Sequence, residues 1–215
     1  VTRQRSFRES RFAQVFTRFV EEVICPGMGG GAGTRIVYQA RPSLRVQAPG
    51  RSGIRLHTDR DYHHQPAEVN WWIPLTPTCG SNTMWLESAP GVGDYEPVEL
   101  QPGQALRFYG NACMHYTMTN ATAATRVSVD VRVCRGDMFD ADSPVSRLPN
   151  EKGQRFALGG YYTHLDVAGA GSEPNAKQEN IGLDRRPSSD RRPSSDEAHE
   201  HRGKNKYYGE SRAWG

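Results

Sequence analysis

The sequence has few cysteines, little net charge and no long hydrophobic run, and each shortage argues against a class of protein. Four cysteines form no CxxC pair and lack zinc-finger spacing, which predicts reduced thiols in an intracellular, cytoplasmic protein rather than a disulfide framework. A formal net charge of +3 predicts no nucleic-acid partner, because a surface that binds nucleic acid needs basic residues clustered on one face. No apolar run approaches the roughly 20 residues of a membrane-spanning helix, so we expect no membrane partner.

The length of 215 residues suits one domain with a sizeable core. We expect residues 1–170 to form this domain and residues 171–215 to form a disordered tail, because the tail repeats RRPSSD in tandem and has few aliphatic residues. The chain begins with Val1 rather than methionine, which leaves open a natural start, and any targeting segment, further upstream.

Apolar residues recur at helical spacing near the beginning of the chain, in "RSFRESRFAQVFTRFVEEVICPG". They follow Phe12 at intervals of three, four, seven and eight positions, which predicts an amphipathic helix over about residues 5–24 that packs on the domain and ends at Pro26. An Arg-rich transit peptide is the alternative, and the paired glutamates Glu21 and Glu22 argue against it. The "GMGGGAGTR" that follows lacks the GxxxxGK[ST] spacing of a phosphate-binding loop, so we interpret it as a flexible connection or a lid.

Short segments rich in β-branched and aromatic residues fill the region from about residue 35 to 135. We count about eight such segments, namely "RIVYQA", "LRVQA", "IRLHTD", "EVNWWIPLT", "TMWLES", "ALRFYG", "MHYTMT" and "TRVSVDVRV". No helical pattern separates them, so the spacing predicts a mainly-β fold: a sandwich, jelly roll or barrel. In "TRVSVDVRV", valines alternate with polar residues from Arg126 to Arg132, and an inward polar face is typical of an interior that holds a ligand.

The stretch "GIRLHTDRDYHHQPAEVNWWIPLT" contains a candidate metal site. His57 and Asp59 are two residues apart, so on a strand their side chains project to the same side. His115 lies 58 positions after His57 (115 − 57 = 58) and is the candidate third ligand. Two histidines and a carboxylate leave coordination positions open and suit non-heme Fe(II). His63 and His64 lie in a loop-like run, and we expect them to line the mouth of the site or to face solvent.

Two residues of the last strand-like segment form a candidate carboxylate clamp. Arg126 follows His115 by eleven positions (126 − 115 = 11), and Ser128 shares its face of the strand. A guanidinium pairs with a carboxylate through two hydrogen bonds, and a hydroxyl adds another donor. Arg132 lies on the same face, where it could instead pair structurally with Asp130 or Asp137.

Further cavity candidates follow from strand alternation in "EVNWWIPLT". Asn70 and Trp72 share one side, which we assign inward because an asparagine in the middle of a strand needs a partner. Trp71 is assigned to the other side. Other substrate-site candidates are Gln39, Arg45, Asn82 and Trp85. The alternatives are ordinary core packing for Trp71 and Trp85, and a turn for Asn82.

The sequence resembles the Fe(II)/2-oxoglutarate-dependent oxygenases in the order of its motifs: HxD (His57 and Asp59), a distal histidine (His115) and RxS (Arg126 and Ser128). The fold of that family is the double-stranded β-helix, an eight-stranded jelly roll. The longer stretches resemble the streptomycin-biosynthesis-type, phytanoyl-hydroxylase-like branch, over roughly residues 35 to 165. The resemblance implies that iron binds to His57, Asp59 and His115. It also implies that Arg126, with Ser128 beside it, binds the distal carboxylate of 2-oxoglutarate.

The function that this resemblance implies is a dioxygenase. It would use Fe(II), O2 and 2-oxoglutarate to hydroxylate or otherwise oxidise a small molecule, with release of succinate, and Asn70 is grouped with the cosubstrate-binding residues. By fold-level analogy the substrate is a polar secondary metabolite or sugar-like compound. A cupin-like metal enzyme that does not use 2-oxoglutarate is one alternative, for which a clamp of Arg126 and Ser128 would be superfluous. A non-catalytic binding module is the other.

Overall fold

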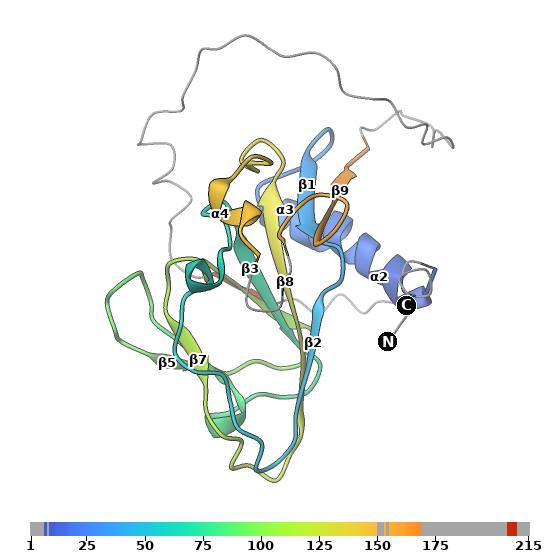
Figure 1. Ribbon diagram of the computed structural model, residues 1–215. Helices are drawn as coiled ribbons and strands as arrows, with labels where there is room; N and C mark the ends of the chain where they lie inside the picture. Colours follow the sequence, from blue (N-terminus) through green and yellow to red (C-terminus); the bar gives the residue numbers. More distant parts are fainter. Residues whose placement is uncertain (1–6, 8, 150–152, 154, 169–205, 210–215) are drawn as a thin grey trace.

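The computed structural model describes residues 7, 9–149, 153, 155–168 and 206–209, and these form a mainly-β molecule, as the sequence predicted. Two antiparallel sheets make up the fold, and a helical segment covers one of them (Figure 1). The first seven segments of helix, turn or strand along the chain are α2 (Arg11–Phe19), η1 (Val20–Ile24), α3 (Cys25–Gly27), β1 (Arg35–Gln39), β2 (Ser43–Gln47), η2 (Asp59–Tyr62) and β3 (Val69–Pro74). The remainder are η3 (Gly80–Asn82), β4 (Met84–Leu86), β5 (Glu96–Val98), β6 (Gln104–Phe108), β7 (His115–Thr117), β8 (Arg126–Arg135), α4 (Pro144–Arg147), β9 (Tyr162–Asp166) and β10 (Lys206–Gly209).

The ten-residue strand β8 organises the larger, seven-stranded sheet. The strand order is β10-β6-β3-β8-β1-β9, and β2 pairs with the first half of β8. In the smaller sheet the order is β5-β4-β7. Three of the strands in the two sheets, β5, β9 and β10, were not among the predicted segments. Of the expected tail, only residues 206–209 are described, and they pair as β10 with β6.

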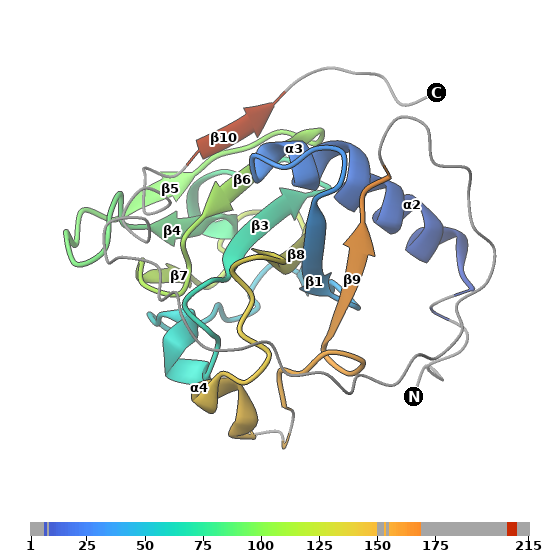
Figure 2. The same ribbon diagram turned by 90° about the horizontal axis from the view of Figure 1, so that it is seen from above.

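The two sheets pack face to face, with helices on the far side of the larger sheet (Figure 2). Side chains from both sheets form one apolar cluster between them: Trp72, Met84, Leu86, Val98, Leu100, Leu106, Phe108 and Cys113. Because Trp72 and the polar residues of β8 share this inner side, the layer between the sheets is where a polar cavity can form.

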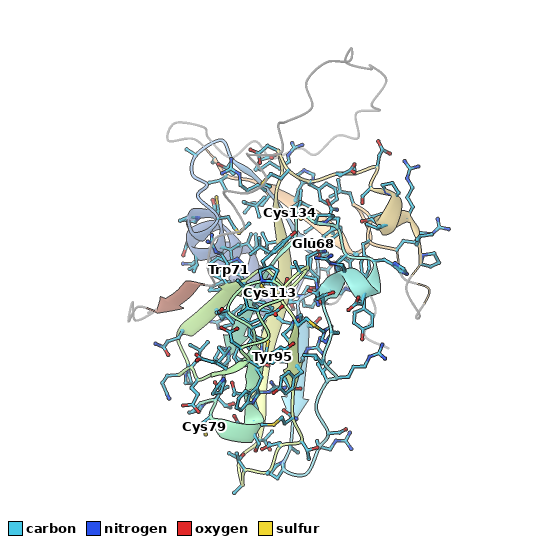
Figure 3. The ribbon with its side chains drawn as sticks, turned by 90° about the vertical axis from the view of Figure 1, so that its left-hand side faces the viewer. Glu68, Trp71, Cys79, Tyr95, Cys113 and Cys134 are labelled. Atoms are coloured by element: carbon cyan, nitrogen blue, oxygen red, sulfur yellow. The ribbon has the colours of Figure 1, made fainter. Side chains whose placement is uncertain are left out.

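All four cysteines are free thiols, as their spacing predicted. Three of them, Cys134, Cys113 and Cys79, lie well apart from the top to the bottom of the view in Figure 3. The fourth, Cys25, is buried beneath the helices. Within the described ranges, the helices are too short or too polar to cross a membrane.

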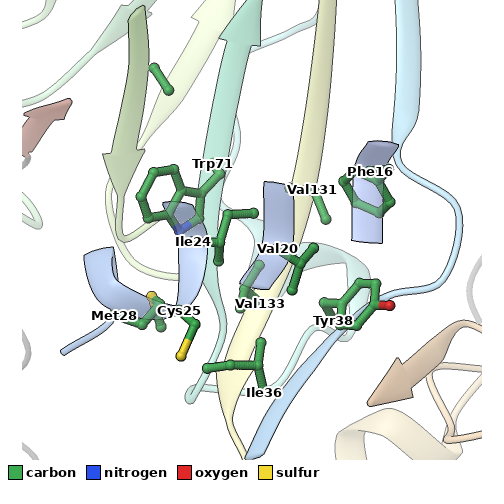
Figure 4. Close-up of a cluster of buried hydrophobic side chains, with 11 residues drawn as sticks. Phe16, Val20, Ile24, Cys25, Met28, Ile36, Tyr38, Trp71, Val131 and Val133 are labelled. Atoms are coloured by element: carbon green, nitrogen blue, oxygen red, sulfur yellow. The ribbon is translucent and has the colours of Figure 1, made fainter. Parts of the chain in front are cut away.

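The N-terminal segment is an amphipathic helix that packs on the larger sheet, as its apolar spacing predicted. The Ser10 side chain accepts a hydrogen bond from the Ala13 N–H (3.1 Å) and caps the beginning of α2. The expected start near residue 5 lies outside the described residues. Helical conformation continues through η1 and α3 to Gly27. Residues four apart, Phe16, Val20 and Ile24, turn toward the sheet. In Figure 4 these side chains meet the sheet residues Ile36, Tyr38, Trp71, Val131 and Val133.

This packing fixes which side of each strand faces the cavity. Val131 and Val133 are fully buried against the helices, so the alternating polar residues of β8 face the smaller sheet. Trp71 likewise packs beneath the helices, whereas Trp72 points the other way. The alternation expected for both strands is therefore confirmed.

Two local expectations were wrong. The segment "IRLHTD" is not a strand: His57 forms only an isolated bridge with His115, and Asp59 begins the 3-10 turn η2. The glycine-rich loop after α3 is not a lid over the cavity, since it lies on the helix-covered side, where the Gly33 N–H donates to the Val167 carbonyl (2.8 Å).

Candidate metal centre

The structure brings His57, Asp59 and His115 together at one end of the layer between the sheets. One ligand atom from each side chain lies within 4.8 Å of the other two. The Nε2 atoms of His57 and His115 are each 4.0 Å from Asp59 Oδ1. The backbones of the two histidines exchange hydrogen bonds of 3.1 and 3.0 Å, which holds the two rings side by side. This arrangement can hold one metal ion.

Backbone carbonyls select the tautomer of both histidines. The Nδ1 atom of His57 lies 2.7 Å from the Arg55 oxygen, and that of His115 lies 3.0 Å from the Cys113 oxygen. A carbonyl oxygen only accepts, so Nδ1 carries the hydrogen in each ring and the Nε2 lone pair is left for a metal. Burial lowers the pKa of His115 to about 4, against the opposing charge of Asp59, so this ring is neutral at pH 7.

The Asp59 carboxylate is fixed by an arginine and an asparagine. Arg132 donates from Nη2 to Oδ1 (2.9 Å) and from Nε to Oδ2 (3.1 Å). Asn70 Nδ2 donates to Oδ2 (2.6 Å), and Gly110 lies against Asn70, where an added Cβ would come within 2.7 Å of that nitrogen. Burial alone would raise the pKa of Asp59, but the charges of Arg132 and then His115 outweigh it and hold the pKa well below its usual range.

A small cavity that is partly open to solvent lies beside this centre. Its walls come from both sheets and from the segment before η2: Arg45, Ile54, His57, Asn70, Trp72, Met84, Phe108, His115, Tyr116, Thr117, Arg126, Asp130 and Arg132. Two of the three candidate ligands, His57 and His115, therefore line this cavity, whereas Asp59 does not.

Arg126 and Ser128 are buried with unsatisfied polar atoms. They are 3 % and 0 % exposed, and neither Arg126 Nε nor Ser128 Oγ has a hydrogen-bond partner among the described residues. Burial, and then the nearby charge of Arg45, lowers the pKa of Arg126 to about 10, so it remains a cation at pH 7. A buried guanidinium nitrogen and a buried hydroxyl are costly without hydrogen-bond partners, and a carboxylate is the kind of acceptor that suits both.

The remaining sequence candidates divide into two groups. Asn70, Trp72 and Arg45 line the cavity, and Asn70 does so while holding Asp59. Gln39 and Asn82 are not among the lining residues.

Local hydrogen bonds explain the placement of this second group. The Gln39 amide donates to the Arg41 carbonyl (2.7 Å) and to Ser43 (3.1 Å), which ties it to the connection between β1 and β2. The Asn82 side chain accepts from the Cys79 N–H (2.9 Å) in η3, the turn role that was its alternative. Trp85 is half-buried and stacks on Tyr116.

His64 is not at a solvent-exposed mouth, which corrects the expectation from sequence. It is 6 % exposed and stacks on Phe156, and its Nδ1 lies 2.7 Å from the fully buried Glu68. The same carboxylate accepts hydrogen bonds from Tyr162 and from the Gln65 N–H. This buried network anchors the segment after η2. His63 adopts a left-handed backbone conformation (φ 71°) at the end of that turn.

Arg132 is the functional residue whose role the sequence did not show. Its alternation with Arg126 placed it on the correct face, but its partner Asp59 lies 73 positions away. Asp130 was one of its two expected partners and does bind it (3.1 Å), whereas Asp137 binds Arg135 instead.

Comparison with known proteins gives one clear sequence relative. No protein-family model matches the chain. The streptomycin biosynthesis protein StrG of Streptomyces griseus is 34 % identical over 128 residues, which cover 59 % of this chain and 59 % of that protein. The chain thus matches less than two thirds of the length of this relative.

Solved structures of similar fold include CytC3 with Fe(II) and alpha-ketoglutarate (18 % identity, TM-score 0.45, 60 % of this chain and 55 % of that one). Another is the non-heme alpha ketoglutarate dependent epimerase SnoN from nogalamycin biosynthesis (15 % identity, TM-score 0.44, covering 70 % of this chain and 72 % of that one). The match to StrG confirms the resemblance of the longer stretches to a streptomycin-biosynthesis-type protein.

Proposed function

We propose that this chain is an Fe(II)- and 2-oxoglutarate-dependent oxygenase that hydroxylates or otherwise oxidises a small molecule. In this proposal the two facing sheets are a double-stranded β-helix, and O2 is the second cosubstrate. One observation carries it: two ligands of the candidate metal centre, His57 and His115, line the same cavity as the buried Arg126, whose Nε has no hydrogen-bond partner among the described residues.

The donor set fits iron. Two neutral imidazoles and one carboxylate are the ligands of non-heme Fe(II) sites that keep positions open for other molecules. His57, Asp59 and His115 would hold the ion, and Arg132 and Asn70 would orient the Asp59 carboxylate. When bound, iron together with 2-oxoglutarate would supply the oxidising chemistry, while the protein supplies position and exclusion of water.

Arg126 and Ser128 also suit the cosubstrate. Arg126 would pair with the distal carboxylate of 2-oxoglutarate through its guanidinium fork, and Ser128 would donate a further hydrogen bond. Trp72 lies under the guanidinium, with its ring centroid 5.9 Å from the Arg126 carbon Cζ, and limits the directions in which Arg126 can point. A cupin-like enzyme that does not use 2-oxoglutarate would leave both unsatisfied groups without a purpose.

Calorimetry with Mn(II), which replaces Fe(II) without O2 chemistry, tests this proposal. We expect 2-oxoglutarate to bind the Mn(II)-loaded protein and to bind Arg126→Ala at least about tenfold more weakly, since a hydrogen-bonded charge contributes roughly 1.5–3 kcal/mol. Arg51→Ala is the matched control, because Arg51 is exposed and is not among the lining residues. Equal affinity in all three proteins would contradict the cosubstrate site.

A further inference from the structure

The cavity contains a second arginine that neither the metal nor the cosubstrate uses. We propose that Arg45 forms a subsite for an anionic group of the primary substrate, a carboxylate or a phosphate. This inference rests on the proposed function, because it assigns Arg126 to 2-oxoglutarate and leaves Arg45 for the molecule that is oxidised.

The strand register places Arg45 beside the cosubstrate clamp but nearer to solvent. Arg45 of β2 is the direct partner of Ser128 of β8, and residues directly opposite in an antiparallel pair project to the same face. The Arg45 side chain is 39 % exposed, whereas Arg126 is 3 % exposed. A molecule that enters after 2-oxoglutarate would therefore meet Arg45 before Arg126.

Asp130 orients Arg45 without covering its tip. Arg45 Nε donates to Asp130 Oδ2 (2.5 Å), and the other carboxylate oxygen accepts from Arg132 Nη1 (3.1 Å). Both oxygens of Asp130 are thus engaged, which leaves this acid poorly placed to bind a cationic substrate. The two Nη atoms of Arg45 have no hydrogen-bond partner among the described residues, and such a pair of donors suits a carboxylate or phosphate.

The charge of the cavity also favours an anionic substrate. Arg45, Arg126 and Arg132 contribute three positive charges, and Asp59 and Asp130 contribute two negative ones, a balance of +1 (3 − 2 = +1). A divalent metal ion and the dianion 2-oxoglutarate cancel each other, so the loaded site keeps this balance. An uncompensated charge is costly in a largely buried site. A negative substrate group would neutralise it, whereas a cationic group would add to it.

Phosphate binding to the loaded protein tests this subsite. The protein is first saturated with Mn(II) and 2-oxoglutarate and then titrated with inorganic phosphate, so that phosphate cannot use the Arg126 clamp. We expect Arg45→Gln to weaken phosphate binding at least about tenfold, since it removes a charged donor pair. Its affinity for 2-oxoglutarate should fall clearly less than that of Arg126→Ala, and retained binding of 2-oxoglutarate also shows that the variant is folded. Arg51→Gln, an exposed arginine outside the cavity, should change neither affinity.

Three results would overturn this assignment. Phosphate could fail to bind the loaded wild type, or bind wild type and Arg45→Gln equally well. Arg45→Gln could also weaken 2-oxoglutarate binding as strongly as Arg126→Ala, which would make Arg45 part of the cosubstrate clamp. Failure of 2-oxoglutarate to bind the Mn(II)-loaded wild type is a distinct result, since it removes the proposed function and this inference with it.

Discussion

Replacing Arg132 with methionine should destabilise the metal-free protein by about 3–5 kcal/mol, the usual effect of removing one partner of a buried ion pair. The Asp59 side chain is 1 % exposed and that of Arg132 is 11 % exposed, so the pair is largely shielded from water. Methionine retains much of the apolar stem of arginine, so the loss reports on charge more than on packing.

The magnitude follows from the bonds that are lost. Arg132 donates two hydrogen bonds to Asp59, and each bond to a charged group contributes roughly 1.5–3 kcal/mol, which gives about 3–6 kcal/mol for these two bonds. Its third bond goes to Asp130, a carboxylate that keeps its hydrogen bond from Arg45. The bond from Asn70 remains, and it supplies a neutral donor only. The two ways of reaching the figure therefore agree.

Urea unfolding in the presence of a chelator measures this loss, and the chain offers a matched control. Arg35 and Asp166 pair through the same Nε and Nη2 atoms, at 2.6 and 3.0 Å, but their side chains are 57 % and 58 % exposed. Arg35→Met should therefore cost less than about 1 kcal/mol. If Arg132→Met loses no more stability than Arg35→Met, the buried ion pair does not hold Asp59 as described.

Three further perturbations test other parts of the structure. Gly110→Ala should weaken metal binding and destabilise the protein by about 1–3 kcal/mol, because the new Cβ displaces Asn70. Gly31 lies in open space, so Gly31→Ala is the control: its metal affinity by calorimetry and its melting temperature should be nearly unchanged. The folded-state pKa of His115, about 4, lies below the unfolded value of about 6.5, so the free energy of unfolding should fall by up to about 3 kcal/mol between pH 6.5 and pH 4. Urea unfolding across this range should show a weaker dependence of that free energy on pH for His115→Gln. An equal dependence in the two proteins would contradict the pKa assigned to His115. Ile24→Ala, at a fully buried contact between helix and sheet, should cost about 2–5 kcal/mol in the same assay, and a loss below about 1 kcal/mol would show that the helix packs loosely.

Alternation with a period of two carried most of what the sequence could predict. Because β8 is a regular strand between the helices and the cavity, its polar residues from Arg126 to Arg132 all face one way, and the sequence alone located them. The same rule placed Asn70 and Trp72 in the cavity and Trp71 in the core.

Local backbone geometry that departs from a regular strand was harder to predict from the sequence. His57 and Asp59 were expected to converge because a strand projects alternate side chains together. In the structure they converge because Asp59 begins a 3-10 turn, in which the Asp61 carboxylate binds the Thr58 N–H (2.8 Å). The prediction that His57 and Asp59 converge is confirmed, but the strand conformation expected to bring them together was wrong.

Long-range pairing was the part that the sequence could not supply. Which acid binds Arg132 depends on how segments 73 positions apart are brought together, and Asp130 and Asp137 were nearer in sequence. Likewise, the buried contact between His64 and Glu68 depends on Tyr162 and Phe156 of the distant β9 region covering them. Polar residues in a loop carry no periodicity that would reveal such burial.

The most direct measurement is the visible absorption spectrum of anaerobic protein titrated with Fe(II) and then with 2-oxoglutarate. The account predicts a charge-transfer band that requires both additions, is weakened in Arg126→Ala, and is absent when His115 is replaced by alanine. Iron that binds without producing a band would contradict the cosubstrate site and favour a metal enzyme of another kind. Failure to bind iron at all would contradict the metal centre itself.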